Sequence, residues 1–261
     1  MIDTAYTLLN SAAEKKIKLY KEEKGAYFVA SVMAGIYVGL CMITILVMAG
    51  ALDHFAGIKI LQGVSFAAAL SLVVFAGAEL FTGNVFVMTA AVMQKSVKPL
   101  DAVKLCAYCY LGNLTGSVII AALFLGTGYL QGPVLEAAHE AMYSKTDPFF
   151  SELFVRGILC NILVCAAVWC VYRMQSEGGK LVMIFWCIYI FVVNGFEHSI
   201  ANMSLFAMEA MTGVDSYTLG RILINLAATT AGNILGGLAL SLAYWSIAKN
   251  TTVSNQQKVA A

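Results

Sequence analysis

The chain has 261 residues, of which 60% are hydrophobic and only 12% are charged, a balance outside that of soluble globular domains. Its formal net charge is +1, and no tail or face concentrates the basic residues that nucleic-acid binding requires. Nucleic acid is therefore excluded as a partner. Membrane lipid is the expected surroundings of an all-α integral membrane protein.

The first 25 residues predict an amphipathic helix that lies along a membrane surface. Apolar residues recur near helical spacing among lysines and glutamates: Leu8, Leu9, Ala12, Ala13, Ile17 and Leu19. The segment lacks the short apolar stretch and small-residue cleavage site of a signal peptide. The first membrane span is the expected targeting signal.

Six apolar blocks follow, each long enough to cross about 30 Å of hydrocarbon as a helix. They lie at residues 28–50, 61–93, 101–130, 150–172, 181–208 and 217–247. The predicted organisation is an N-terminal helix over residues 1–25, one six-helix membrane domain over 26–248 and a polar tail over 249–261.

The lysines and arginines of alternate loops predict the orientation. With the N-terminus inside, the inner side carries twelve: Lys15, Lys16, Lys18, Lys21, Lys24, Lys95, Lys98, Lys104, Arg173, Lys180, Lys249 and Lys258. The outer side carries four: Lys59, Lys145, Arg156 and Arg221. Both termini are therefore expected in the cytoplasm, and the protein in the inner (plasma) membrane of a prokaryote as a multi-pass protein.

The second and fifth blocks are interrupted by matching polar segments, which predicts two broken helices. Both segments read G-x-E-x-x-x-[GA]-N, beginning at Gly77 and Gly195, 118 residues apart. The third and sixth blocks echo each other through G-N-x-x-G, whose small residues let helices approach closely. The chain is thus predicted to be an inverted repeat of about 28–130 and 150–247, with a permeation site where the breaks meet.

His198 is the only histidine within an apolar block, and it lies at the second break. An ionisable group at membrane depth marks a functional site by default, and imidazole can share a proton with a weak acid near neutral pH. The alternative is a neutral histidine that hydrogen-bonds backbone freed by the break. The two interpretations are compatible.

Glu79 and Glu197 come just before the helical segment that follows each break. A carboxylate there can accept hydrogen bonds from unpaired N–H groups of the first turn, so both are predicted to cap the helix breaks. Thr82, at the tip of the first break, offers a hydroxyl that could face His198 across the symmetry axis. A threonine that only caps the backbone fits the pattern nearly as well.

Phe66, Leu70 and Phe191 lie one to three turns before the breaks. Spacing alone favours ordinary helix packing for them over an apolar constriction. Lys145 is one of the four outer cations and comes just before the fourth block. It either attracts anions to an entrance or is a solvated loop lysine.

The sequence contains no pair of nucleophile and base, phosphate-binding loop or metal-ligand cluster, so we expect neither enzyme activity nor a cofactor or metal ion. All seven cysteines fall in apolar blocks, where a thiol behaves as a small hydrophobe. Cys106 and Cys109 form a C-x-x-C without the second pair or nearby histidines that a metal site needs.

Three segments carry a family resemblance: Glu79–Asn84 (ELFTGN), Gly157–Trp169 (GILCNILVCAAVW) and Gly195–Met203 (GFEHSIANM). Together they resemble the formate/nitrite transporter family. The resemblance extends from the amphipathic N-terminal helix to Tyr244 and Trp245, near the end of the sixth block.

The resemblance implies an aquaporin-like protomer of six transmembrane helices, with helices 2 and 5 broken, and a homo-pentamer in which each protomer has its own pore. In the family a central histidine, here His198, faces a threonine that matches Thr82. Asparagines of the family's substrate pathway match Asn161 and Asn233.

The family's two hydrophobic constrictions match Phe66 and Phe191, with Leu70, Leu80 and Phe81 toward the cytoplasmic side. This assignment replaces the packing interpretation that spacing alone favours.

An outer lysine of the family matches Lys145. Its implied role is to draw the anion in and to raise the chance that the anion is protonated before the constriction. Desolvating the bare ion there costs free energy that the neutral acid avoids. The sequence leaves open whether His198 itself donates the proton.

The implied function is a channel for small monovalent anions of weak acids, which permeate with a proton. The segments around Thr82 and His198 look more like nitrite and hydrosulfide channels than formate channels, so nitrite comes first, hydrosulfide second, and formate stays open. A proton-coupled secondary transporter is the alternative class, since inverted repeats also permit alternating access. A third class is a membrane scaffold without transport.

Overall fold

The computed structural model describes residues 2–52, 55–213 and 216–259. Within these ranges the secondary structure is α-helical and includes no strand. The helices are α1 (Ile2–Glu22), α2 (Lys24–Ala51), α3 (Ile58–Phe66), α4 (Ala68–Phe75), α5 (Phe81–Met93), α6 (Pro99–Gly126), α7 (Pro133–Thr146), α8 (Phe150–Arg173), α9 (Glu177–Val193), α10 (Ser199–Thr212) and α11 (Ser216–Val259).

Five helical segments are long and apolar enough to cross a membrane: Lys24–Ala51, Ile58–Phe75, Pro99–Gly126, Phe150–Arg173 and Thr218–Lys249. They correspond to five of the six predicted blocks. The remaining block is divided between α9 and α10, which have 17 and 14 residues, so neither piece reaches membrane length alone.

The two predicted breaks are confirmed at residues 76–80 and 194–198. Gly77 and Gly195 have φ angles of +74° and +66°, in the left-handed region that glycine tolerates without steric cost. The chain is then extended at Leu80 and His198, directly before α5 and α10 begin. The second half of each sequence motif therefore forms the first helical turn after the break.

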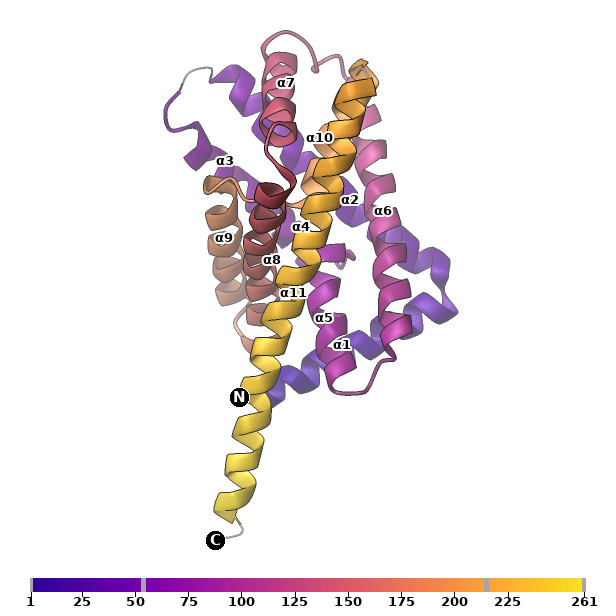
Figure 1. The fold of residues 1–261 in the computed structure, drawn as a ribbon, viewed down its shortest axis with the longest axis vertical. Helices are drawn as coiled ribbons and strands as arrows, with labels where there is room; N and C mark the ends of the chain where they lie inside the picture. The colour runs from indigo at the N-terminus through magenta and orange to yellow at the C-terminus, as the bar shows by residue number, and fades with distance from the viewer. Residues whose placement is uncertain (1, 53–54, 214–215, 260–261) are drawn as a thin grey trace.

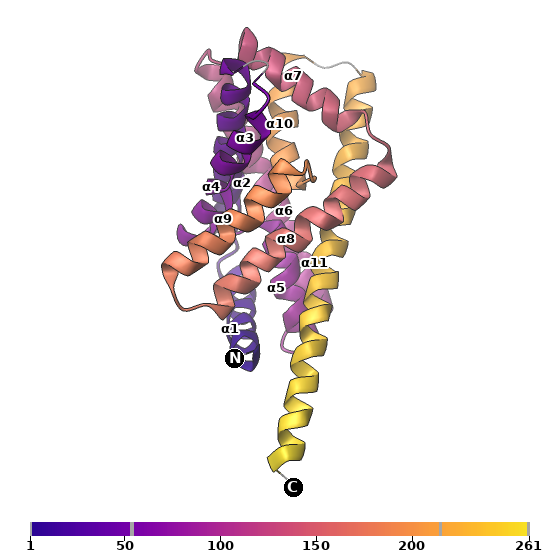
Figure 2. The ribbon, with the colours of Figure 1, turned by 90° about the vertical axis from the view of Figure 1, so that its left-hand side faces the viewer.

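The two halves of the chain are inverted relative to each other (Figures 1 and 2). Helix α1 and the final turns of α11 lie at one end of the molecule, and α7 lies at the other. Helix α5 follows its break toward the α1 end, whereas α10 follows its break toward the α7 end. The breaks thus lie near mid-depth, with their following helices pointing to opposite ends.

Glycines bring the paired helices of each half into backbone contact. A Cβ atom at Gly116 on α6 would overlap the carbonyl oxygen of Val32 on α2. In the same way, a Cβ atom at Gly232 on α11 would overlap the carbonyl oxygen of Phe154 on α8. The small residues of G-N-x-x-G are therefore required by close approach.

Two surface helices precede the two halves. Helix α1 was predicted, and Leu9 and Ala13 bury its apolar face, whereas Leu8 is 49% exposed. Helix α7 was not predicted, because it is too polar to stand out as a block, although Pro133 at its first turn is a helix-start signal. Helix α11 continues through the predicted tail to Val259, and residues 260 and 261 lie outside the described residues.

Candidate substrate pathway

Two cavities lie at opposite ends of the bundle. We call the first the α1 vestibule; it measures about 250 Å³, and its lining includes Lys16, Leu70, Glu79 and Leu80. The second, the α7 vestibule, measures about 300 Å³, and its lining includes Lys59, Phe66, Lys145, Arg156, Phe191, Glu197 and His198. Each vestibule therefore brings a lysine together with the glutamate of one break.

A central cavity of only about 10 Å³ connects the linings of the two vestibules. It shares Leu70 and Leu80 with the α1 vestibule, and Phe66, Phe191 and His198 with the α7 vestibule. The rings of Phe66 and Phe191 meet edge to face with centroids 6.0 Å apart. A space of this size accommodates about one water-sized sphere, so the centre is a narrow apolar neck.

The structure places Phe81 away from this neck. Its ring packs edge to face on Tyr110, with centroids 4.9 Å apart, and borders an apolar groove between α5, α6 and α11. Phe81 is the first residue of α5, one position after Leu80, so the two side chains leave the backbone in different directions. Leu80 faces the neck and Phe81 does not.

His198 and Thr82, which lie on different halves of the chain, meet at the centre. His198 Nε2 is 3.0 Å from Thr82 Oγ1, and both residues are buried. The backbone N–H of Ala201 donates to His198 Nδ1 at 3.2 Å. Because Nδ1 is an acceptor, a neutral imidazole carries its proton on Nε2 and donates it to Thr82. The Thr82 hydroxyl then keeps its own proton to donate elsewhere.

Asn161 links this centre to Asn233 on α11. Its Nδ2 donates to the carbonyl oxygens of Asn233, at 2.6 Å, and Thr82, at 3.3 Å. Its Oδ1 is buried and has no hydrogen-bond partner within the described residues. Asn161 therefore holds Thr82 from behind and retains one unused acceptor beside it.

Asn233 lies behind the second break and holds its backbone. Its Oδ1 accepts from the Ser199 N–H at 2.9 Å, and its Nδ2 donates to the carbonyl oxygens of Gly157 and Glu197 at 2.8 and 2.9 Å. The side chain is fully buried. These three bonds occupy the amide, so Asn233 supports the pathway from outside it.

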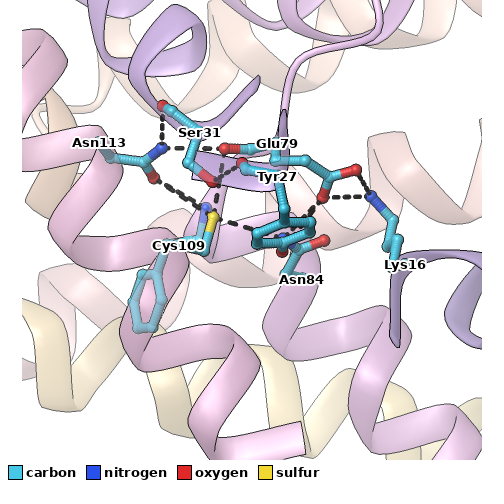
Figure 3. Close-up of polar contacts among 8 residues, drawn as sticks. Lys16, Tyr27, Ser31, Glu79, Asn84, Cys109 and Asn113 are labelled. Atoms are coloured by element: carbon cyan, nitrogen blue, oxygen red, sulfur yellow. Dashed lines mark hydrogen bonds and ion pairs between the residues drawn. The ribbon is translucent and has the colours of Figure 1, made fainter. Parts of the chain in front are cut away.

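Asn113 forms the same clamp at the first break (Figure 3). Its Oδ1 accepts from the Phe81 N–H at 2.9 Å, and its Nδ2 donates to the carbonyl oxygens of Ser31 and Glu79 at 2.7 and 2.9 Å. Sequence reasoning missed Asn113 as a functional residue, although its place in the repeated G-N-x-x-G matches that of Asn233.

At the α1 vestibule, Glu79 forms an ion pair with Lys16 of the surface helix α1 (Figure 3). Lys16 Nζ lies 2.5 Å from both carboxylate oxygens, and Asn84 Nδ2 donates to Oε2 at 2.9 Å. The Tyr27 hydroxyl also donates to Oε2, at 3.4 Å. Sequence reasoning did not assign Lys16, because its partner is 63 residues away.

At the α7 vestibule, Glu197 repeats this arrangement with the surface helix α7. Lys145 Nζ donates to both carboxylate oxygens at 3.1 Å, and Asn202 Nδ2 donates to Oε2 at 2.6 Å. Asn202 in turn bonds Asn225 Oδ1 at 2.8 Å. Lys145 thus lines the α7 vestibule and is paired with Glu197.

The predicted capping role of Glu79 and Glu197 needs correction. Within the described residues, no backbone N–H donates to either carboxylate; both accept from side chains instead. The first-turn N–H groups are held by Asn113, Asn233 and His198. The carboxylates face the vestibules, where lysines neutralise them, so they are not available to the backbone behind.

The ion pair with Glu79 keeps Lys16 charged. Burial lowers the pKa of Lys16, but the adjacent carboxylate outweighs this effect, and the net direction is upward. A raised lysine pKa means that the stability gained from charged Lys16 is fully present below the ordinary lysine value of about 10.4 and is lost as the pH rises through the raised pKa. The pair therefore holds α1 against the bundle across the neutral range.

We expect Lys16→Met to loosen α1. Glu79 is 12% exposed, and removing the partner of a largely buried charge costs about 1–3 kcal/mol where water in a vestibule moderates the loss. Amide hydrogen exchange in α1, measured by mass spectrometry, should therefore rise about tenfold or more. Lys18→Met is the control, because Lys18 is 72% exposed and its ion pair is a long contact of 3.8 Å with Glu22 on the same helix. Equal exchange in the two variants would refute the tether.

Membrane-length helices that enclose two charged vestibules and an apolar neck define a membrane channel or transporter, not an enzyme. The chain belongs to the formate/nitrite transporter family, whose model, described as "Formate/nitrite transporter", matches residues 3–246. The family resemblance of the sequence is thereby confirmed.

Relatives and solved structures agree with this assignment. The nitrite transporter NirC of Escherichia coli (strain K12) is 39% identical over 222 residues, which cover 84% of this chain and 82% of that protein. The uncharacterized transporter YwcJ of Bacillus subtilis (strain 168) is 34% identical, with coverage of 87% and 91%.

A solved structure described as "FNT family ion channel" superposes with a TM-score of 0.87 at 35% identity and covers 93% of this chain and 98% of its own. Another, described as "Pentameric formate channel with formate bound", gives a TM-score of 0.71 at 30% identity, with coverage of 91% and 98%.

Proposed function

We propose that the protein is a channel for small monovalent anions of weak acids, with nitrite as its principal substrate. The observation that carries this proposal is a narrow apolar neck between two lysine-bearing vestibules, with Thr82 and His198 at its centre. The similarity to the nitrite transporter NirC favours nitrite. The similarity to a formate channel with formate bound keeps formate as the second candidate.

The vestibules and the neck suit different forms of the substrate. Lys145, Lys59 and Arg156 outnumber Glu197 in the α7 vestibule, so its net positive charge attracts the anion. The neck between Phe66 and Phe191 disfavours a bare charge because desolvation there is costly. The anion therefore takes up a proton from hydronium in the water of one vestibule and crosses the neck as the neutral acid. On the far side the acid gives this proton back to water and the anion reforms.

Thr82 and His198 guide the acid through the neck. With Nε2–H of His198 donating to Thr82, the threonine hydroxyl can donate to an oxygen of the passing substrate. An imidazolium would set an Nδ1–H against the Ala201 N–H, so two donors would face each other. The neutral form is therefore favoured, and His198 positions the threonine without acting as the proton source.

The assembly and orientation follow from the relatives and the charge bias. We infer a homo-pentamer of six-span protomers, as in the formate channel of similar fold. We also infer that the α1 vestibule faces the cytoplasm and the α7 vestibule the outside of a prokaryotic inner membrane, which the twelve-to-four distribution of lysines and arginines supports.

Stopped-flow flux into proteoliposomes tests this function. We expect nitrite and formate to pass at least about tenfold faster than chloride, poorly saturated and faster at lower external pH, since the neutral acid crosses the neck. Thr82→Val should lower nitrite flux about tenfold, because one hydrogen bond to the substrate is lost. Thr89→Val is the control, since Thr89 bonds the Val85 carbonyl on the same helix, away from the neck.

Two outcomes would contradict the proposal. Saturable uptake that accumulates nitrite against its own gradient would establish proton-coupled transport with alternating access. Flux no greater than in empty liposomes would exclude permeation and favour a scaffold without transport.

A further inference from the structure

The two vestibules carry unequal charge. Among the described residues, the α1 vestibule is lined by one cation, Lys16, and one carboxylate, Glu79. The α7 vestibule is also lined by a lysine and glutamate pair, but Arg156 and Lys59 are added to it. The α7 vestibule therefore has two more positive charges, although the frame around both breaks is the same.

Part of this difference in charge comes from Arg156, whose backbone position has an equivalent in the first half. The N–H of Glu197 donates to the carbonyl oxygen of Arg156 at 3.4 Å, and the N–H of Glu79 donates to the carbonyl oxygen of Ala30 at 3.0 Å. The next residues in the chain accept from the two clamp asparagines in the same way. Arg156 is thus the counterpart of Ala30, one backbone contact away from the second break.

The guanidinium of Arg156 is uncommitted. Both oxygens of Glu197 are already bonded by Lys145, and one of them also by Asn202. No described residue pairs with the Arg156 side chain or accepts a hydrogen bond from it, whereas Arg221 donates to the Asp147 and Pro148 carbonyl oxygens. Arg156 is half-buried and lines the vestibule, so its donors face the space that an incoming anion occupies.

A guanidinium selects anions by shape as well as by charge. Its planar fork of N–H donors matches two oxygens in one plane, as in nitrite and formate, with two parallel hydrogen bonds. Hydrosulfide and chloride present a single acceptor atom, so they cannot place a separate acceptor opposite each arm of the fork. Lysine gives the same charge to any anion and has no fork.

We propose that Arg156 is a specificity-determining residue that captures planar two-oxygen anions in the α7 vestibule, beside Lys145. The inference rests on the proposed function and deepens it, because it names the anion class that this vestibule prefers. The α1 vestibule, with alanine at the equivalent position, lacks this preference.

Chemical protection tests binding without transport. The chain has three arginines, at positions 156, 173 and 221, so phenylglyoxal modification can be followed at each by peptide mass spectrometry. At equal ionic strength, nitrite and formate should slow the modification of Arg156 several-fold relative to chloride. Arg173, at the other end of α8 and in neither vestibule, should react at one rate throughout. Equal protection by chloride, or no protection, would overturn the proposal.

Flux of variants tests the same residue in transport. Arg156→Gln should lower nitrite flux at low concentration about tenfold at low salt, from the loss of both charge and fork. Arg156→Lys should restore hydrosulfide flux, corrected for empty liposomes, but leave nitrite several-fold below wild type. Arg173→Lys is the matched control. If nitrite and hydrosulfide flux changed by the same factor in Arg156→Lys, or if nitrite flux recovered fully in this variant, selection by the fork would be refuted. Absence of wild-type flux would count against the proposed channel, and the protection assay would still decide the role of Arg156.

Discussion

Asn233→Leu is expected to destabilise the protein by about 3 kcal/mol or more. The substitution removes the partner of the Ser199 N–H and of the carbonyl oxygens of Gly157 and Glu197, all in a buried region. A buried polar group left without a partner costs about 1–3 kcal/mol. A fall in the midpoint of unfolding in detergent, by about 5 °C or more, would report the loss.

The matched control for this substitution is Asn194→Leu. Asn194 is exposed, and among the described residues its amide donates only to the Ile190 carbonyl oxygen, one turn earlier. Its replacement should change stability by less than about 0.5 kcal/mol. Asn113→Leu should match Asn233→Leu, because it holds the other break through the same three kinds of bond. If Asn233→Leu were no worse than Asn194→Leu, the clamp would not support the break.

Two alanine substitutions on α11 should have opposite signs. Gly232→Ala would put a Cβ atom against the backbone of Phe154, Gly157 and Ile158, which cannot move aside as a flexible side chain can. We expect α8 and α11 to separate slightly, at a cost of about 1–3 kcal/mol. A Cβ atom at Gly220 meets no atom of the described residues within 4 Å, so Gly220→Ala should stabilise the helix by up to about 1 kcal/mol.

Both substitutions replace a glycine of α11 by alanine, so the difference between their unfolding midpoints reports the close contact at Gly232. Thermal unfolding in a single detergent should rank Gly220→Ala, wild type and Gly232→Ala in order of falling midpoint. Equal midpoints for the two variants would mean that α8 and α11 accommodate the extra methyl group by moving without cost.

Local pattern was sufficient to predict the breaks. Gly77 and Gly195 supply backbone conformations that other residues rarely adopt, and each stands in a repeated motif that also contains a glutamate and an asparagine. Helix α7 was not predicted, because a short polar helix has no continuous apolar block to reveal it. Its position over the α7 vestibule depends on Lys145 and on tertiary packing.

The candidate site was predictable where its chemistry is unusual for a membrane interior. His198 and Thr82 stood out for this reason, and the structure puts them 3.0 Å apart. Lys16 and Asn113 were harder, because a lysine among many on α1 and an asparagine within a packing motif have ordinary explanations. Only the fold brings them to Glu79, which lies 63 residues from Lys16 and 34 from Asn113 along the chain.

The hydrogen bonds around the breaks fall into two groups, those within one half of the chain and those between the halves. The bonds of Asn113 stay within the first repeat and those of Asn233 within the second, whereas Thr82 bonds His198 and Asn161 across the boundary. Each half therefore holds its own break, whereas the site at Thr82 and His198 is formed by both halves. The central contact needs the second half to bring His198 to Thr82. Thr82 and His198 are not counterparts in the repeat, because with the offset of 118 residues Thr82 matches Ile200 and His198 matches Leu80. A symmetric backbone frame therefore carries an asymmetric centre.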